Sequence, residues 1–279
     1  MNVYLILFAL VLAGAIRVYF WHKFWKGEGR KLQKSGYLPP APSWFAHVFF
    51  RCVNRLIVFL GIGPVKVIGR EKLRKFKKAR KLVAPNHTQP PDWALVNQGV
   101  DYERYTAVTS ELRGTRGLLS AWSGCFGVDP KQPSGAEEFV SSCIEVLASK
   151  PGASLLYFPQ GKLVADNVLR PEDFRPGAVR IARKAAAQVG SEPVVIVPVA
   201  IYYNQDRAQA TWLHRLMLTI GQKWFRSMFG HKNVGAVVVI GDPIPVNQLP
   251  SDPDPEHPHN ATEYLRGKIQ ELLLIAERS

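Results

Sequence analysis

After residue 64 the chain alternates between apolar runs and segments with helical periodicity. The apolar runs are rich in valine and isoleucine, as in strands that are buried on both faces. The expected strands span residues 65–69, 81–85, 104–109, 154–159, 193–203 and 235–244. The expected helices span residues 92–98, 135–148, 176–188 and 261–277. Near-continuous apolar strands that alternate with helices predict an α/β fold with a sheet covered by helices on both faces.

The first 40 residues have a different pattern. An apolar, uncharged run covers residues 2–16, and seven basic or histidine side chains follow between Arg17 and Lys34. Because a spanning helix needs about 20 residues, this run crosses a membrane only if Arg17 extends to the interface. A cleaved signal peptide is disfavoured, since no basic residue precedes the run. We expect a membrane anchor, with the α/β domain on the cytoplasmic face because the basic residues follow the run.

A second apolar segment covers residues 43–63. Arg51 and Arg55 lie four positions apart among bulky apolar side chains, a pattern typical of a helix at a membrane interface. A helix packed in the protein core is the alternative. Prolines at positions 39, 40 and 42 separate this segment from the first one. We therefore expect a membrane-binding helical pair in residues 1–63 and an α/β domain in residues 64–279.

The charge balance limits the possible partners. The chain has 36 Lys and Arg residues against 22 Asp and Glu residues, a formal net charge of +14, which favours anionic partners. With two apolar segments and no nucleic-acid-binding motif, a surface of anionic lipids is favoured over nucleic acid. The basic segment of residues 70–81 is either a solvated helix face or a contact site for lipid headgroups or an acidic acyl carrier.

Three other features predict no chemistry. Cys52, Cys125 and Cys143 have no close pairing, which argues against a disulfide framework or a zinc site. Residues 251–260 contain carboxylates and two histidines, but their prolines favour a solvated loop over a metal site. Residues 209–229, rich in Trp, Leu, Phe and Arg, are expected to form a helix or to run along the membrane.

The chemically distinctive stretch is NHTQPPD, residues 86–92, directly after an expected strand. Strand ends commonly deliver reactive side chains to the carboxyl edge of a sheet. A carboxylate at Asp92 is placed to accept a hydrogen bond from one imidazole nitrogen of His87, which leaves the other nitrogen free to take a proton. The nucleophile would then be a hydroxyl of the substrate. By itself this spacing also suits a structural cap.

Several further stretches carry a family resemblance. FPQGKL begins at Phe158, FRPGAVRIA at Phe174, VPVAI at Val197 and VVVIGDPIPV at Val237. Together with NHTQPPD, and in this order, they resemble the glycerolipid acyltransferase family, whose bacterial type member acylates 1-acylglycerol-3-phosphate. The similarity covers about residues 65–246. It implies a mixed, mostly parallel sheet and an N-terminal helical pair that docks on membranes.

The resemblance also implies a mechanism and a site. His87 would be the general base on a lipid hydroxyl, Asp92 would orient it, and the acyl thioester of coenzyme A or acyl carrier protein would be attacked directly. Backbone N–H groups around Gly161 are candidates for stabilising the oxyanion. No metal and no organic cofactor is implied. The expected substrate-binding residues are Lys131, Phe158, Pro159, Gln160, Gly161, Lys162, Arg175 and Gly177.

The chain departs from the family pattern in two blocks. The third block usually has glutamate and arginine where this chain has Gln160 and Leu163, and the second block has Pro130 where an arginine is usual. Both arginines face the acceptor phosphate in the family. Lys131, Lys162 and Arg175 are possible substitutes, although lysine lacks the bidentate fork of arginine.

Three hypotheses remain open. The acceptor is 1-acylglycerol-3-phosphate or a related lysophospholipid, or it is a lipid alcohol without a phosphomonoester. Alternatively, the domain is a catalytically inactive lipid-binding module of the same fold.

Overall fold

The computed structural model describes residues 3–112, 114–129, 133–164, 166–190, 192–204, 216, 219 and 235–279. Most of the expected segment 209–229 therefore lies outside the described residues. The chain divides into two compact units. Unit 1 comprises Met1–Ala46 and Thr106–Ser142, and unit 2 comprises His47–Tyr105 and Cys143–Ser279.

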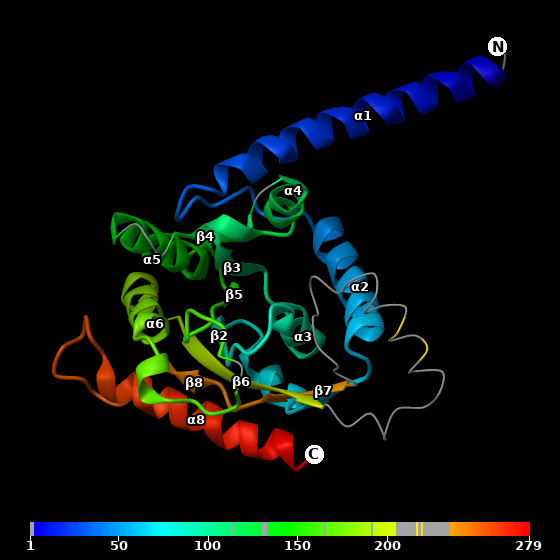
Figure 1. The fold of residues 1–279 in the computed structure, drawn as a ribbon. Coiled ribbons are helices and arrows are strands. Elements are labelled where there is room, and N and C mark those ends of the chain that lie inside the picture. The colour runs from blue at the N-terminus through cyan, green and yellow to red at the C-terminus, as the bar shows by residue number, and fades with distance from the viewer. Residues whose placement is uncertain are drawn as a thin grey trace. The chain divides into compact units, whose positions relative to one another are not determined.

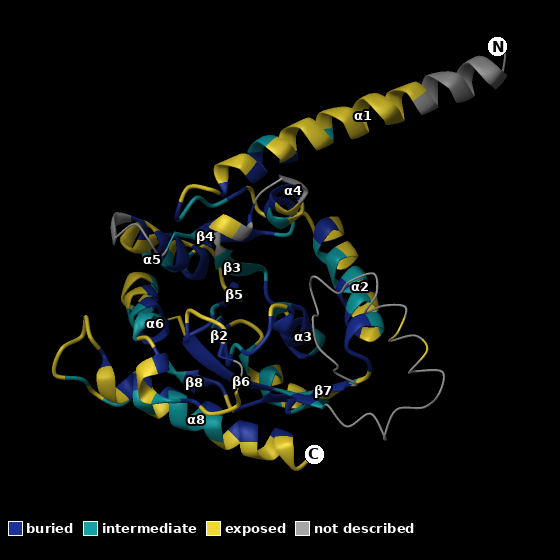
Figure 2. Cartoon of the chain, viewed as in Figure 1, coloured by how far each residue is buried: buried dark blue, intermediate teal, exposed yellow. Residues whose placement is uncertain are grey.

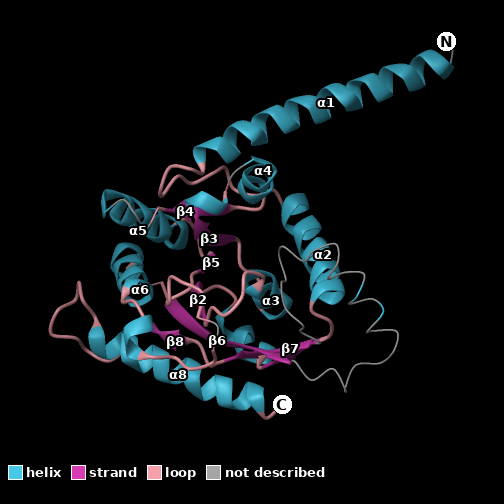
Figure 3. Ribbon diagram, in the orientation of Figure 1, coloured by secondary structure: helices cyan, strands magenta, loops and turns pink. Residues whose placement is uncertain are grey.

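Unit 2 is built on a mixed, mostly parallel sheet (Figures 1 and 3). In spatial order its strands run β1-β7-β6-β2-β5-β3, and β8 pairs with β6. All the pairings given for this sheet are parallel except those of β6 with β7 and with β8. The bounds are β1 Val65–Ile68, β2 Arg80–Pro85, β3 Arg104–Val108, β5 Ser154–Leu156, β6 Val194–Asn204, β7 Gly235–Ile240 and β8 Ile244–Pro245.

Helices cover both faces of this sheet. Alternate residues of β6, from Val195 to Tyr203, lie in one core cluster with residues of α2 (Trp44–Gly61) and α3 (Asp92–Gly99). The other face of β6 contacts α6 (Gly177–Val189) and α8 (His259–Glu277), as Figure 1 shows. This alternation follows from the two-residue period of a strand. The expected α/β architecture with a doubly covered sheet is therefore confirmed.

The central strand β2 determines where the candidate site lies. It pairs in parallel with β5 on one side and β6 on the other, and Pro85 at its end lies opposite Val199 of β6. Because β6 continues for five residues beyond Val199, the loop that leaves β2 runs beside β6 rather than into solvent. His87 and its neighbours thus begin at the carboxyl edge of a buried strand.

Unit 1 contains α1 (Val3–Lys31), α4 (Gly114–Trp122), β4 (Cys125–Val128) and the first ten residues of α5 (Pro133–Ala148). The expected apolar run and the basic residues after it form one continuous helix. The second half of α1 packs against α4 so closely that a Cβ at Gly29 would lie 2.6 Å from the backbone of Gly117. Leu32, just after α1, is fully buried, whereas Val18, Tyr19 and Phe20 are exposed (Figure 2).

The expected elements are found with small shifts in their ends. The expected strand 154–159 is shorter, because the chain turns after β5 and the N–H of Gly161 donates to the carbonyl of Phe158. The expected strand 235–244 is divided into β7 and β8. Helix α4 and strand β4 were not predicted, because they are only nine and four residues long. The part of the chain that the structure describes also contains short 3-10 helices at Arg70–Phe76, Thr109–Glu111, Pro171–Asp173 and Val246–Gln248.

Helix α2 combines the two alternatives considered for its sequence. Its inner side chains Asn54 and Val58 are buried, while Trp44 and Leu56 are 77% and 58% exposed (Figure 2). Among the described residues, α2 is the one helix whose length and composition would allow it to cross a membrane. It is therefore an apolar helix with a packed side and an exposed side, which is compatible with membrane binding.

Candidate active site

The loop that links β2 to α3 is attached to β6 by Asn86. The side chain of Asn86 is fully buried, and its Nδ2 donates to the carbonyl of Ile201 at 3.0 Å. The N–H of Ile201 donates in return to Oδ1 of Asn86 at 2.7 Å. Beyond the end of β2, the side-chain amide of Asn86 therefore satisfies the backbone N–H and carbonyl of Ile201 in place of a strand backbone. It also holds the start of the loop against β6.

Asp92 is the first residue of α3, and its carboxylate closes the loop. Oδ2 accepts hydrogen bonds from the N–H groups of Thr88 at 2.6 Å and Gln89 at 3.0 Å. It also contacts Nδ1 of His87 at 2.9 Å. The side chain is fully buried, and an ionised carboxylate in that position is stable only when its oxygens are hydrogen-bonded. The sequence-based expectation that Asp92 lies beside His87 is met by this geometry.

His87 is held in one orientation. Its Nδ1 faces a carboxylate, which is an acceptor, so Nδ1 carries the proton and Nε2 has the free lone pair. The imidazole stacks on Phe158 of the segment after β5, with 3.9 Å between the ring centroids and 22° between the planes. The side chain remains 19% exposed. A partly exposed imidazole, oriented through its Nδ1 by Asp92, is thus placed at the sheet edge.

Tyr203 is a site residue that the sequence did not indicate. Its hydroxyl donates to Oδ1 of Asp92 at 2.5 Å, from near the end of β6. Burial, followed by the charge of Asp92 and the hydrogen bond to it, raises the pKa of Tyr203 well above its ordinary value. Tyr203 is therefore a neutral O–H donor. The sequence carried only a weak signal for this role. The expected strand ends in two adjacent tyrosines, and because successive side chains point to opposite faces of a sheet, one of them must face the helix that carries Asp92.

The segment after β5 wraps around the backbone of His87. Oε1 of Gln160 accepts the N–H of His87 at 2.6 Å, and the N–H of Val164 donates to the His87 carbonyl at 2.8 Å. Gln160 is 1% exposed, so its observed contact is with the loop. Among the described residues, Nε2 of Gln160 and Oγ1 of Thr88 are buried with no hydrogen-bond partner. Two polar atoms thus remain available beside the His87–Asp92 pair.

Gly161 has a structural role in this segment. Its φ angle of 62° lies in the left-handed region that favours glycine. Its N–H, which the sequence suggested as an oxyanion donor, already donates to the Phe158 carbonyl at 3.1 Å. In this structure, therefore, that N–H is used within the turn. The carbonyl of Pro159 accepts the N–H of Arg175 at 3.0 Å, which ties the turn to the start of α6.

The expected basic residues fall into different environments. Nζ of Lys162 forms an ion pair with Asp173 at 2.6 Å. Arg175 is exposed and lies over the turn, since a Cβ at Gly161 would be 3.5 Å from both its Cδ and its Nε. Gly177 starts α6 where a Cβ would collide with the hydroxyl of Tyr157. The remaining expected basic residue, Lys131, lies outside the described residues.

The basic segment of residues 70–81 lies at the other end of β2. Most of it precedes that strand and its last two residues begin the strand, whereas His87 follows it. Arg80 is buried and paired with Glu192 at 2.6 Å, and Nζ of Lys81 donates to the Ala79 carbonyl at 2.8 Å. The exposed basic side chains are those of Arg70, Arg74, Lys75, Lys77 and Lys78. Any anionic partner of this surface would bind away from His87.

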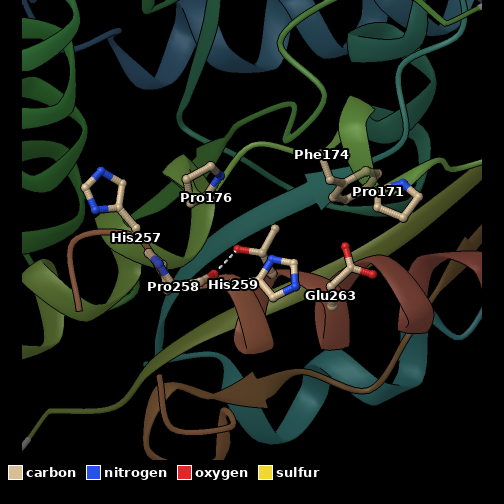
Figure 4. A pocket seen from close by; sticks show the side chains of 8 residues that line it. Pro171, Phe174, Pro176, His257, Pro258, His259 and Glu263 are labelled. Atoms are coloured by element: carbon tan, nitrogen blue, oxygen red, sulfur yellow. Dashed lines mark hydrogen bonds between the residues drawn. The ribbon is translucent and has the colours of Figure 1, made fainter. Parts of the chain in front are cut away.

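A separate shallow cavity of roughly 190 Å³ lies between the segment at residues 171–176 and the start of α8 (Figure 4). His257, His259 and Glu263 line it together with prolines, and His257 pairs with Asp254 at 2.7 Å. In the part of the chain that the structure describes, no three metal-ligating side chains lie close enough to hold an ion. His87 and Asp92 are not in the lining of this cavity.

Comparisons with known proteins identify the family and the fold of the chain. Residues 64–202 match the acyltransferase family, a range that includes His87, Asp92 and Gln160. The fold is similar to the crystal structure of the 1-acyl-sn-glycerophosphate acyltransferase PlsC from Thermotoga maritima. The TM-score is 0.51 at 17% identity, and the match covers 96% of this chain and 89% of that one. Comparison with curated proteins finds no match. The chain belongs to the acyltransferase family.

Proposed function

We propose that the protein transfers an acyl group from a thioester, acyl-CoA or acyl carrier protein, to a hydroxyl of a lipid. The observation that carries the proposal is the His87–Asp92 pair. Its Nδ1 contact of 2.9 Å orients the imidazole, and its exposed edge leaves Nε2 accessible. The pair matches the base and orienting acid of a serine hydrolase, with the acceptor hydroxyl in place of the serine.

The chemistry proceeds by direct transfer. Nε2 of His87 takes the proton of the lipid hydroxyl as its oxygen attacks the thioester carbonyl. The C–S bond of the tetrahedral intermediate then breaks, an ester forms, and the thiolate leaves. The imidazolium returns its proton to the thiolate, which completes the cycle with no net proton change. Asp92 stabilises the imidazolium while it exists, and Tyr203 and the N–H groups of Thr88 and Gln89 hold the carboxylate in place.

The exposed apolar side chains of α2 support a membrane substrate. Helix α2 exposes Trp44, Phe45 and Leu56, and single-chain lipids are delivered most directly from a bilayer surface. We assign residues 1–63 to membrane attachment and residues 64–279 to catalysis. The basic side chains in and after α1 favour the cytoplasmic face, where they would meet anionic lipids.

The test is a transfer assay with purified protein in mixed micelles. A radiolabelled acyl thioester is offered with a panel of lysolipids and glycolipids, and both released thiol and labelled lipid are measured. His87→Ala should reduce transfer by about 10²- to 10⁴-fold. Asp92→Asn should also reduce it strongly, because the imidazole loses the acceptor that orients it. His257→Ala, at an exposed histidine away from the pair, is the control and should leave the rate unchanged.

Two results would contradict the proposal. One is transfer at wild-type rate by the His87→Ala protein. The other is absence of transfer with every donor and acceptor in a folded sample that still binds lipid vesicles, which would favour an inactive lipid-binding module.

A further inference from the structure

The turn after β5 contacts His87 and carries two exposed side chains, Lys162 and Leu163. Residues 158–164 contact His87 three times: Phe158 stacks on the ring, Gln160 accepts the backbone N–H, and Val164 donates to the carbonyl. Lys162 and Leu163 lie between the last two contacts. Their side chains are 58% and 48% exposed. Lys162 and Leu163 are thus exposed side chains on the same short segment that holds the backbone and ring of His87.

The lysine is already neutralised. Its Nζ lies 2.6 Å from Oδ1 of Asp173, a carboxylate that is only 8% exposed. A buried carboxylate is screened less by water than a surface one, so this pairing is stronger than an ordinary exposed ion pair. Pulling Lys162 away to bind an anion would leave the charge of Asp173 less compensated in a poorly solvated place.

Arg170, the next basic residue along the chain, also forms ion pairs. Arg170 binds Asp166 through two contacts of 2.6 and 3.2 Å, and its NH1 lies 3.7 Å from Asp173. The hydrogen bonds between the two side chains raise the pKa of Arg170 and lower the pKa of Asp166. Between residues 158 and 176 the chain has three basic and three acidic side chains. The segment of residues 158–176 therefore has no net formal charge.

Unlike Lys162 and Arg170, Arg175 is not paired with a carboxylate among the described residues. Its side chain lies over Gly161, and among the described residues it has no ion-pair partner. One unpaired guanidinium balances one negative charge. A phosphate monoester carries about −1.5 to −2 charges at neutral pH, and partial desolvation without matching cations is costly.

We propose that the acceptor is a lipid alcohol whose headgroup carries at most one negative charge and no phosphate monoester, and that the Lys162–Asp173 pair and Leu163 set this preference. The inference rests on the proposed acyl transfer and names its acceptor class. Arg175 is the contact for a phosphodiester or a polar neutral headgroup.

The experiment compares three acceptors with the same hexanoyl chain: hexanoylglycerol-3-phosphate, hexanoylglycerophosphoglycerol and hexanoylglycerol. Full-length wild-type protein and one acyl thioester are used throughout. The kcat/KM for the diester or the neutral alcohol should exceed that for the monoester by about tenfold or more. Equal or higher kcat/KM for the monoester would overturn the proposal.

Charge variants test the assigned residues. Asp173→Asn releases Lys162, and Leu163→Arg adds a cation at the turn; each should raise kcat/KM for the monoester by about tenfold relative to the neutral alcohol. Leu163→Arg keeps the test valid if Asp173→Asn does not fold, because its position is exposed. Glu172→Gln is the matched control: it removes one negative charge from the same 3-10 helix, and no described residue forms a salt bridge with that carboxylate. If Glu172→Gln shifts the preference as much as Asp173→Asn does, the effect is general electrostatics and the assignment is wrong.

Binding measurements separate this proposal from the one on which it rests. If no acceptor is acylated, the proposed function fails, and the preference is then measured by calorimetric titration of the three hexanoyl lipids into the His87→Ala protein. Weaker binding of the monoester would support the acceptor class, and tighter binding of the monoester would refute it.

Discussion

The hydroxyl of Tyr203 and the imidazole of His87 bind the two oxygens of one carboxylate. Tyr203 donates to Oδ1 of Asp92 at 2.5 Å, and Nδ1 of His87 contacts Oδ2 at 2.9 Å. Because Asp92 is fully buried, these contacts and the two backbone N–H groups on Oδ2 hold the carboxylate in one rotamer. The orientation of the imidazole therefore depends on a residue that is 111 positions away from Asp92.

Replacing Tyr203 with phenylalanine should lower kcat by about tenfold, equivalent to about 1.4 kcal/mol of transition-state stabilisation, with little change in KM. The ring still fills its place in the core, but Oδ1 of Asp92 loses its donor. Steady-state kinetics with the labelled thioester measure the effect. Tyr202→Phe is the control, since the neighbouring side chain points to the opposite face of β6. Unchanged kcat in Tyr203→Phe would show that the hydroxyl does not support Asp92.

The raised pKa of Tyr203 also predicts a pH dependence of stability. The native hydroxyl stays protonated above pH 10, whereas a tyrosine in the unfolded chain ionises there, so unfolding releases a proton and stability falls as pH rises. The contribution is fully present below the unfolded pKa and is lost above it, at about 1.4 kcal/mol per pH unit. Urea unfolding from pH 9 to 11 should therefore show a shallower decline for Tyr203→Phe. Parallel curves for the two proteins would contradict the prediction.

Asn86→Ala should destabilise the protein by about 2–4 kcal/mol. The substitution leaves the N–H and the carbonyl of Ile201 without partners in a buried place, and each unsatisfied group costs about 1–3 kcal/mol. Denaturant unfolding monitored by circular dichroism measures the change. Asn167→Ala, at an exposed loop position, should change stability by less than about 0.5 kcal/mol. An equally small change in stability for Asn86→Ala would mean that water binds the backbone groups of Ile201 in place of the Asn86 side chain.

Gln160→Ala should lower kcat while the glutamate variant retains most of it. The alanine removes the acceptor of the His87 N–H, so the loop that carries the imidazole loses a fixed point. Glutamate keeps an acceptor oxygen of the same reach. The comparison requires kcat and KM for both variants with one thioester and one acceptor. If Gln160→Glu is as impaired as Gln160→Ala, then the amide nitrogen, which has no partner among the described residues, is the important atom.

The exposed side of α2 should control membrane binding. Trp44, Phe49 and Leu56 are all more than one-third exposed, and burial of such side chains in lipid contributes about 1.5–3 kcal/mol each. The triple serine variant should therefore bind anionic vesicles at least tenfold more weakly in a flotation assay. The control carries Leu274→Ser and Ile275→Ser, which remove comparable exposed apolar surface from α8. Equal losses in both proteins would show that α2 is not the docking element.

Much of the fold could be predicted because the signals are local. A strand that is buried on both faces must be continuously apolar, and a helix must repeat its apolar side about every 3.6 residues, so β2, β6, α6 and α8 can be recognised from their own residues. The short elements α4 and β4 lack enough residues to show a period. The basic segment before β2 has the composition of a binding surface, and its place before a strand that His87 follows already separates it from His87 by the length of that strand.

The sequence by itself determined that His87 and Asp92 flank a stiff turn after a buried strand, because their separation is five residues and the prolines restrict the path between them. The tertiary structure decided what holds the pair in place. Asn86 bonds to Ile201 across 115 positions, Gln160 to His87 across 73, and Tyr203 to Asp92 across 111. Contacts of this range depend on which strands become neighbours. Strand order is set by the packing of the whole sheet, so no local pattern in the chain encodes it.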